Sequence, residues 1–263
     1  NLDQKIILSW NAMLCSALAR CYHATGINEY KSDCINLFET ISNQCCDNDL
    51  NLKHCIYHNG KSTAATLEDY SFYIKAMLDV YELNFDKSFI KKAEKLFLKL
   101  ENLFTNKNHM YSFSSDDIFS RQIELLDGNY KSANCLIAEL KMKMYHCTGN
   151  QKYKDQAESM MNSIAKSASK FPTSFSSWLG AIMNNYYGIK EISILGKDFQ
   201  EATNKLLQNF IPSLILMSSQ NPDKDFPLLN KPENSLTMIY VCENFSCRSP
   251  MEINDDFINA ILN

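Results

Sequence analysis

The stretch YHATGINEYK at residues 22–31 recurs at residues 145–154 as YHCTGNQKYK, with six of ten positions identical at the same offsets. A looser copy, YELNFDKSFI, occupies residues 81–90, so the copies begin at 22, 81 and 145, that is 59 and then 64 residues apart. Each copy follows an apolar helical stretch and precedes a more amphipathic one. Gly26 and Gly149 suit the end of the first helix, because glycine adopts the left-handed conformation freely. We therefore predict the elbow of a helical hairpin at each copy.

The period near 60 residues also restricts the architecture. It is too long for tetratricopeptide or ankyrin units of about 33 to 34 residues and for HEAT or armadillo units of about 40 to 47. It suits a two-helix unit with a short elbow and one long loop, and the long loops 43–66 and 105–130 would then gather at one mouth. About three and a half hairpins precede residue 190. The sequence thus predicts a mainly α fold, a partial six-hairpin α/α toroid over residues 1–189.

After Tyr187 and Gly188 the pattern changes to short apolar runs typical of strands. The runs cover residues 191–196, 213–217 and 238–242. A helix is expected to begin at Asp198, a good N-cap, and a last helix at about 255–262. Residues 190–263 are therefore predicted to form a separate, small α/β C-terminal module.

The composition favours long helices and excludes several partners. Only 7 Gly and 6 Pro interrupt a chain of 263 residues with 45% hydrophobic content. The net charge of -4 gives no electrostatic reason to expect nucleic acid or an anionic membrane as partner. No window approaches the roughly 18 apolar residues that cross a bilayer. We expect a soluble, cytoplasmic chain; its start at Asn1 rather than Met is consistent with processing or with a piece of a longer protein.

The ten cysteines are scattered and never form C-x-x-C, so we interpret them as free thiols of a reducing compartment. Cys242 and Cys247 lack the second pair of Cys or His that a zinc site needs, and structural thiols are the favoured interpretation. The Gly60-Lys61-Ser62 run is no phosphate loop, because Cys55 stands where a glycine is required. No metal or cofactor is expected.

Several short motifs follow one another in an order that resembles a known family. They are Asp3-x-Lys5 before Trp10-Asn11, Leu67-Glu68-Asp69-Tyr70, Arg121 with Asp127-Gly128 and Ser132-x-Asn134, Ile194-Leu195-Gly196, and Tyr240-Val241-Cys242-x4-Cys247-x2-Pro250. In this order they resemble the C-terminal part of the spermatogenesis-associated protein 20 family. The resemblance implies an (α/α)6 barrel that follows a thioredoxin-like domain and earlier barrel helices, both missing from this chain. The family barrel is similar to those of N-acylglucosamine 2-epimerases and six-hairpin glycosidases.

Polar and aromatic residues near the starts of the expected inner helices make up the predicted site. Helix N-termini that share one mouth present unpaired N–H groups and polar side chains, as sugar pockets commonly do. Glu68 and Asp69 are the candidate acid/base residues, with Asp127 as a further carboxylate. The candidates for holding a substrate are Trp10, Asn11, Tyr70, Arg121, Ser132 and Asn134. The structural alternatives are helix capping for Glu68 and Asp69, and a plain ion pair for Asp127 and Arg121.

Two functions are consistent with these residues. The first is a carbohydrate-active enzyme domain, epimerase-like or glycosidase-like, with acid/base chemistry on a sugar. The second is a non-catalytic binding or scaffold module, which offers its open face to a partner such as the missing N-terminal part of a longer protein. An enzyme needs carboxylates in a pocket, whereas a scaffold needs an exposed apolar surface.

Overall fold

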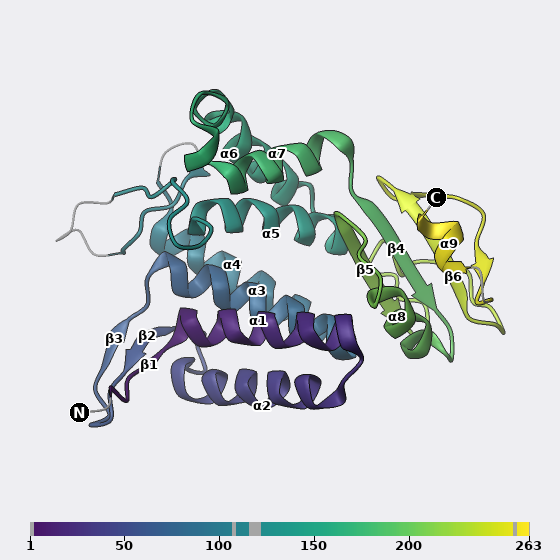
Figure 1. Cartoon of the computed structure of the whole chain (residues 1–263), viewed down its shortest axis with the longest axis horizontal. Helices are drawn as coiled ribbons and strands as arrows, with labels where there is room; N and C mark the ends of the chain where they lie inside the picture. Colours follow the sequence, from purple (N-terminus) through teal and green to yellow (C-terminus); the bar gives the residue numbers. More distant parts are fainter. Residues whose placement is uncertain (1–2, 107–108, 116–121, 255–256, 263) are drawn as a thin grey trace.

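The computed structural model describes residues 3–106, 109–115, 122–254 and 257–262. Figure 1 shows an array of paired helices followed by a smaller sheet-containing part. The hairpins are α1 (Leu8–Thr25) with α2 (Asn28–Cys45), α3 (Leu67–Asn84) with α4 (Ser88–Phe104), and α5 (Ala133–Thr148) with α6 (Gln151–Lys170); a short 3-10 turn, Pro172–Ser174, leads to α7 (Ser176–Tyr187). The predicted mainly α array of about three and a half hairpins is confirmed.

The three elbows share one backbone geometry. The residue that ends each inner helix has a positive φ, 71° at Gly26, 55° at Phe85 and 71° at Gly149. Each donates its backbone N–H to the carbonyl oxygen of the tyrosine four residues earlier: Gly26 to Tyr22 at 2.7 Å, Phe85 to Tyr81 at 2.6 Å and Gly149 to Tyr145 at 2.7 Å. The looser central copy is therefore a true repeat of the other two.

The inner helices α1, α3 and α5 run in the same direction, and α3 lies between the other two (Figure 1). Most side chains of α3 are buried, because α4 covers it from outside while α1 and α5 flank it. The outer helix α4 buries one face only, through Ile90, Ala93, Leu96, Phe97, Leu100 and Phe104. This amphipathic pattern is the one expected of a helix that covers an inner layer.

A small antiparallel sheet lies at the end of the array where α1 and α3 begin. It has the order β1-β2-β3, formed by Ile6–Ile7, Lys53–Ile56 and Ser62–Ala64. The sequence predicted only an irregular loop over residues 43–66. These strands are two to four residues long and β3 is exposed throughout, so they lack the apolar alternation that identifies a strand.

The C-terminal part begins with β4 (Lys190–Leu195), α8 (Phe199–Leu207) and β5 (Leu214–Ser219). β4 and β5 are parallel and α8 connects them, whereas β6 (Met238–Glu243) pairs with β4 antiparallel. β7 (Ser246–Cys247) and β8 (Met251–Glu252) extend the sheet on β6, and α9 (Phe257–Leu262) ends the chain. The predicted strands and the helix after Asp198 are confirmed; the division into two domains at residue 190 remains a proposal.

Two of the ten cysteines form a disulfide, between Cys242 on β6 and Cys247 on β7. The expectation of free thiols throughout is therefore wrong for this pair, although the other eight cysteines are free. The two residues lie directly opposite each other on adjacent antiparallel strands, which brings their sulfur atoms together. The spacing of five residues in the sequence does not reveal this pairing, because the two cysteines meet only when a tight turn places β7 beside β6.

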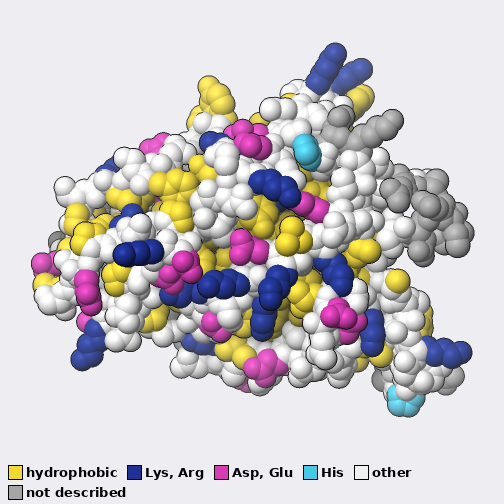
Figure 2. All heavy atoms as spheres, turned by 180° about the vertical axis from the view of Figure 1, so that it is seen from behind, with side chains coloured by type: hydrophobic (Ala, Val, Ile, Leu, Met, Phe, Trp, Pro, Cys, Tyr) yellow, Lys and Arg dark blue, Asp and Glu magenta, His cyan; other side chains and the backbone are white. Residues whose placement is uncertain are grey.

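Within the described residues, no helix has both the length and the apolar character needed to cross a membrane. Figure 2 shows the molecule from behind, with Lys and Arg side chains interspersed among Asp, Glu and hydrophobic ones over this face. The mixed distribution of charge agrees with the nearly balanced composition.

Candidate functional site

The N-terminal ends of the inner helices are tied together by side chains. The backbone N–H of Ser9 in α1 donates to Oδ1 of Asp69 in α3 at 3.2 Å. The hydroxyl of Tyr130, just before α5, donates to Oε1 of Glu68 at 2.8 Å. The starts of α1 and α3 and the approach to α5 thus form one mouth, as the repeat predicted.

Glu68 stays partly open to solvent, as does Asp127, whereas Asp69 is buried. Its partner Tyr130 is 40% exposed and packs edge-on against Phe72, with the ring centres 5.6 Å apart. Partial burial is the larger cause and the hydrogen bond to Glu68 the smaller one; together they raise the pKa of Tyr130 to about 12. The phenol therefore stays protonated at neutral pH, and its O–H group donates a hydrogen bond to Glu68. A partly open carboxylate beside a neutral phenol is an arrangement that can exchange a proton with a bound hydroxyl group.

Asp69 is fully buried, and its oxygens accept from several donors. Besides Ser9, these donors are the backbone N–H of Thr66 at 2.8 Å, the Thr66 hydroxyl at 3.0 Å and Nδ1 of His54 at 2.9 Å. Thr66 and Asp69 form a capping box at the start of α3. The geometry therefore matches the interpretation of Asp69 as a helix cap. Its carboxylate also joins α1, α3 and strand β2.

Asp127 and the start of α5 form a second structural cluster. Oδ2 of Asp127 accepts from the backbone N–H of Ser177 at 2.8 Å and from the hydroxyl of Ser176 at 3.1 Å, at the start of α7. Its Oδ1 accepts from the backbone N–H of Ser132 at 3.3 Å. Ser132 itself caps α5 by accepting from the N–H of Cys135 at 3.2 Å. Asp127 thus connects the starts of two helices.

Asn134 holds the long loop that precedes α5. Its Nδ2 donates to the carbonyl oxygens of Tyr111 and Glu124, at 3.0 and 3.1 Å, and its Oδ1 accepts from the N–H of Tyr111 at 2.9 Å. Because the side chain is fully buried, it fixes the loop against the helix. Tyr70 is also buried, and its hydroxyl accepts from the backbone N–H of Leu52 at 3.3 Å.

Trp10 and Asn11 lie in the first turn of α1. Trp10 is 61% exposed, while Nδ2 of Asn11 donates to the carbonyl oxygen of Ile7 at 2.8 Å. The remaining predicted residue, Arg121, lies outside the described residues. The structure therefore brings Trp10, Asn11 and Glu68 to the same end of the array with their surfaces at least partly open.

A cavity of about 700 Å³ lies along the inner face of the array and reaches the C-terminal ends of the inner helices. The inner helices α1, α3 and α5 form one side, and the end of α7 with residues 207–215 forms another. Lys131, the residue after Tyr130, lines the cavity together with Glu139, to which it is ion-paired at 2.5 Å. The volume of the cavity falls in the range of small-molecule sites. Glu68 and Tyr130 do not line this cavity, so the pair at the mouth and the cavity are separate features.

Charged residues in the inner helices line this cavity, and the sequence analysis missed them. Lys75 pairs with Asp79 at 2.5 Å within α3, and Lys143 of α5 pairs with Glu82 at 2.5 Å. Burial alone would raise the pKa of Asp79, but the charges of Lys75 and Lys143 outweigh it and hold this pKa below its ordinary value. The signal was present: positions 75, 79 and 82 follow a helical i, i+4, i+7 spacing inside an otherwise apolar helix.

Comparisons with known proteins support the resemblance based on the motifs. No protein-family model matches the sequence. The chain is 23% identical to spermatogenesis-associated protein 20 of Rattus norvegicus over 277 residues, which cover 95% of the chain and 35% of the relative. It is 21% identical to the uncharacterized protein B0495.5 of Caenorhabditis elegans, over 96% of the chain and 37% of that protein. The chain thus spans about a third of the length of the curated relatives that it matches.

Solved structures show the same fold. A family 76 glycoside hydrolase, an α-mannanase of Bacteroides thetaiotaomicron, superimposes on 90% of this chain and 65% of its own with a TM-score of 0.54 and 14% identity. A cellobiose 2-epimerase of Spirochaeta thermophila covers 61% of this chain and 43% of its own with a TM-score of 0.50 and 13% identity. The α/α toroid architecture is confirmed by these neighbours, and the similarity to spermatogenesis-associated protein 20 extends over nearly the whole of this chain.

Proposed function

We propose that this chain is the carbohydrate-binding and acid/base part of a longer enzyme, acting on a sugar in the manner of an epimerase or a glycosidase. The observation that carries the proposal is the hydrogen-bonded pair Glu68 and Tyr130, which lies at the same end of the array as the exposed Trp10. The separate cavity on the inner face of the array has a charged and polar lining, which suits a ligand covered with hydroxyl groups, since such a ligand offers donors and acceptors in every direction.

In this proposal Glu68 exchanges the proton, because its carboxylate is partly exposed and has a phenol as its neighbour. Trp10 offers an exposed aromatic face for a sugar ring, and Asn11 offers the acceptor of its amide group. Asp69 and Asp127 are positioning residues in this proposal. Asp69 holds α1 against α3, and Asp127 holds the start of α5 against that of α7. Ser132 and Asn134 fix the loop that carries Tyr130.

A thermal-shift titration with monosaccharides, disaccharides and N-acyl amino sugars tests this assignment. We expect one sugar class to raise the melting temperature, and Glu68→Gln and Tyr130→Phe each to reduce the shift several-fold. Glu39→Gln, at an exposed position of α2, is the matched control and should leave the shift unchanged. If the shift is the same in all three variants, the ligand does not use Glu68. Turnover is then assayed only for the sugar class that binds.

The second candidate function, a non-catalytic scaffold, is favoured by apolar residues exposed at both ends of the array. Trp10 and Leu14 of α1 are 61% and 50% exposed, and Tyr186 and Tyr187 at the end of α7 are 82% and 76% exposed. Exposed apolar surface of this kind is typical of interaction sites. A chain that binds no sugar of the panel but loses partner binding on Leu14→Glu would support the scaffold.

We also propose a cytoplasmic location, which microscopy of the tagged full-length protein would test.

A further inference from the structure

The disulfide of this chain lies at the wall of a pocket. A second cavity, of about 670 Å³, is lined by Cys242 and Cys247 together with Tyr187, Pro212 and Arg248. Cys242 is only 3% exposed, whereas Cys247 is half-buried. A small thiol that entered this pocket would therefore meet the sulfur of Cys247 first.

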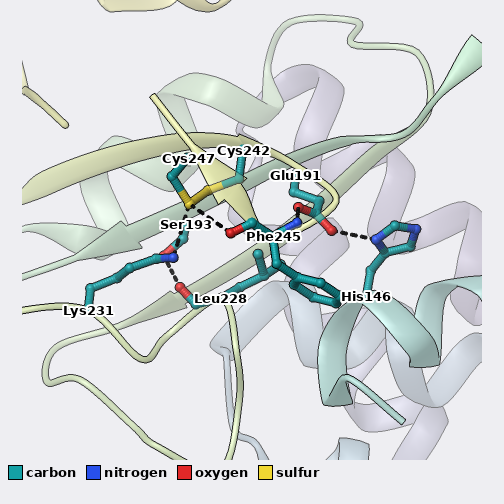
Figure 3. Close-up of a disulfide and its surroundings, with 8 residues drawn as sticks. All are labelled: His146, Glu191, Ser193, Leu228, Lys231, Cys242, Phe245 and Cys247. Atoms are coloured by element: carbon teal, nitrogen blue, oxygen red, sulfur yellow. Dashed lines mark hydrogen bonds and ion pairs between the residues drawn. A yellow bond between two sulfur atoms is a disulfide. The ribbon is translucent and has the colours of Figure 1, made fainter. Parts of the chain in front are cut away.

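A lysine points at the same sulfur. In Figure 3 the amine of Lys231, from the segment between β5 and β6, approaches the disulfide, and the distance from its Nζ to Sγ of Cys247 is 3.0 Å. A positive charge at that distance favours the thiolate of Cys247 over the thiol once the bond to Cys242 is broken. Stabilisation of the reduced form in this way makes a disulfide easier to reduce, and a thiolate of lower pKa is also a better leaving group.

Contacts other than the disulfide hold the hairpin of residues 242–247 in place. The backbone N–H of Phe245 donates to Oε2 of Glu191 at 2.8 Å, and Oε1 of Glu191 lies 2.5 Å from Nδ1 of His146 in α5. Figure 3 shows Phe245 together with Glu191 and His146. The ring of Phe245 also packs edge-on against Tyr145, with the ring centres 5.3 Å apart. Because these contacts do not involve sulfur, the two thiols stay opposite each other after reduction, and the disulfide can form again.

We propose that Cys242 and Cys247 form a thiol–disulfide exchange site whose reactant is a thiol reductant that enters the pocket. The thiolate of the reductant attacks Sγ of Cys247, and the bonding electron pair passes to Cys242, whose sulfur takes up a proton. A second thiolate then attacks the reductant sulfur of this mixed disulfide and releases Cys247 as a thiolate beside Lys231. Two thiols of the reductant are oxidised to one disulfide, and the disulfide of the chain is reduced to two thiols.

The test equilibrates the purified chain with glutathione mixtures of graded ratio, and separately with dithiothreitol mixtures. Free thiols are then trapped by alkylation and assigned by peptide mass spectrometry, which separates this pair from the exposed thiol of Cys21. We expect Cys242 and Cys247 to titrate together, as one two-electron couple, while circular dichroism shows unchanged helicity. A pair that stays oxidised until the helices unfold would overturn the proposal, because it would be a purely structural crosslink.

Substitutions of Lys231 test the role of its charge. Lys231→Met should lower the equilibrium constant for reduction about tenfold, which corresponds to about 30 mV for a two-electron couple. It should also slow alkylation of Cys247 in the reduced chain several-fold, and Lys231→Arg should restore both values. Lys224→Met, an exposed lysine of the same segment, is the matched control. A reduction potential and an alkylation rate unaffected by Lys231→Met would refute the role of Lys231, and with it the proposed exchange site.

Discussion

At the scale of the residue, the three elbows show how one conformation is reached with different side chains. Gly26 and Gly149 adopt φ of 71° without a steric penalty, whereas a residue with Cβ loses about 1 to 2 kcal/mol there. Phe85 adopts φ of 55° nevertheless. Its ring is buried and packs edge-on against Tyr81 and Phe199, at 5.3 and 6.2 Å between ring centres. The burial of an aromatic side chain, which contributes about 1.5 to 3 kcal/mol, offsets the backbone strain.

Alanine at the two glycine elbows should have unequal effects. A Cβ at position 149 would lie 2.8 Å from Cγ of Pro227, a ring with little freedom, whereas at position 26 it would meet the flexible side-chain amide of Gln208 at 3.0 Å. We expect Gly149→Ala to lower the free energy of unfolding by about 2 to 3 kcal/mol and Gly26→Ala by about 1. Urea unfolding followed by circular dichroism measures both. Equal losses would mean that the contact with Pro227 adds nothing.

Glu68 and Asp69 are neighbours in the sequence, yet they should differ in what their substitution changes. Asp69→Asn replaces one of the two oxygens that accept from Ser9, Thr66 and His54 by an NH2 group, which cannot accept, so we expect a loss of about 1 to 3 kcal/mol in the free energy of unfolding. Glu68→Gln only weakens one partly exposed hydrogen bond, because the amide oxygen can still accept from Tyr130, and it should cost less than about 0.5 kcal/mol. The same unfolding experiment compares them, and a stable Asp69→Asn variant would argue against the structural role of Asp69.

At the scale of the element, α3 combines an almost fully buried helix with a row of charges on its cavity face. Lys75, Asp79 and Glu82 each lie beside a side chain of opposite sign there: Asp79 pairs with Lys75, and Glu82 pairs with Lys143. Pairing of this kind compensates for the loss of hydration that the cavity wall imposes. The charges cost stability if any one of them loses its partner.

The lowered pKa of Asp79 predicts how stability depends on pH. The carboxylate binds its proton less readily in the folded chain than in the unfolded one, whose value is about 3.8. Its contribution is therefore present above pH 3.8 and disappears as the pH falls through the lower, folded pKa. We expect Asp79→Asn to cost about 1 to 3 kcal/mol at neutral pH and clearly less in acid. Denaturant unfolding from neutral to acidic pH measures the difference, with the exposed Asp33→Asn as control; a loss independent of pH would contradict the ion pair.

At the scale of the whole molecule, the array is open at both ends. Its first helix exposes Leu14 and its last exposes Met183 and Tyr186, at 50%, 55% and 82% of their surfaces. Helices within the array bury such positions against the next hairpin, as α3 does on both sides. Two apolar edges on one molecule favour association with a further surface of the same character.

We therefore expect the isolated chain to associate in a concentration-dependent way. Leu14→Glu and Tyr186→Ser should each shift sedimentation-velocity profiles towards the monomer, since each makes one edge polar. Leu98→Glu is the matched control, because Leu98 is 57% exposed on the outer helix α4, away from both edges. A chain that remains monomeric at high concentration, or one that Leu98→Glu dissociates equally well, would contradict this role of the edges.

The repeat at residues 22, 81 and 145 determined the helical array by itself, because a left-handed helix end and an apolar helix before it are local features of sequence. Apolar runs likewise located β4, β5 and β6, since buried strands are recognisable one by one. The strands β1 to β3 were missed, because they form through pairing rather than through their own pattern.

Only the tertiary structure decided what each candidate side chain does. The sequence could place Glu68 and Asp69 at one mouth, but which of two adjacent carboxylates is buried depends on whether Ser9 and His54 approach it from other elements. The charged wall of the cavity and the approach of Lys231 to Cys247 also join residues from separate segments. Burial and hydrogen bonding are properties of a residue's neighbours in space, and those neighbours exist only after the chain has folded.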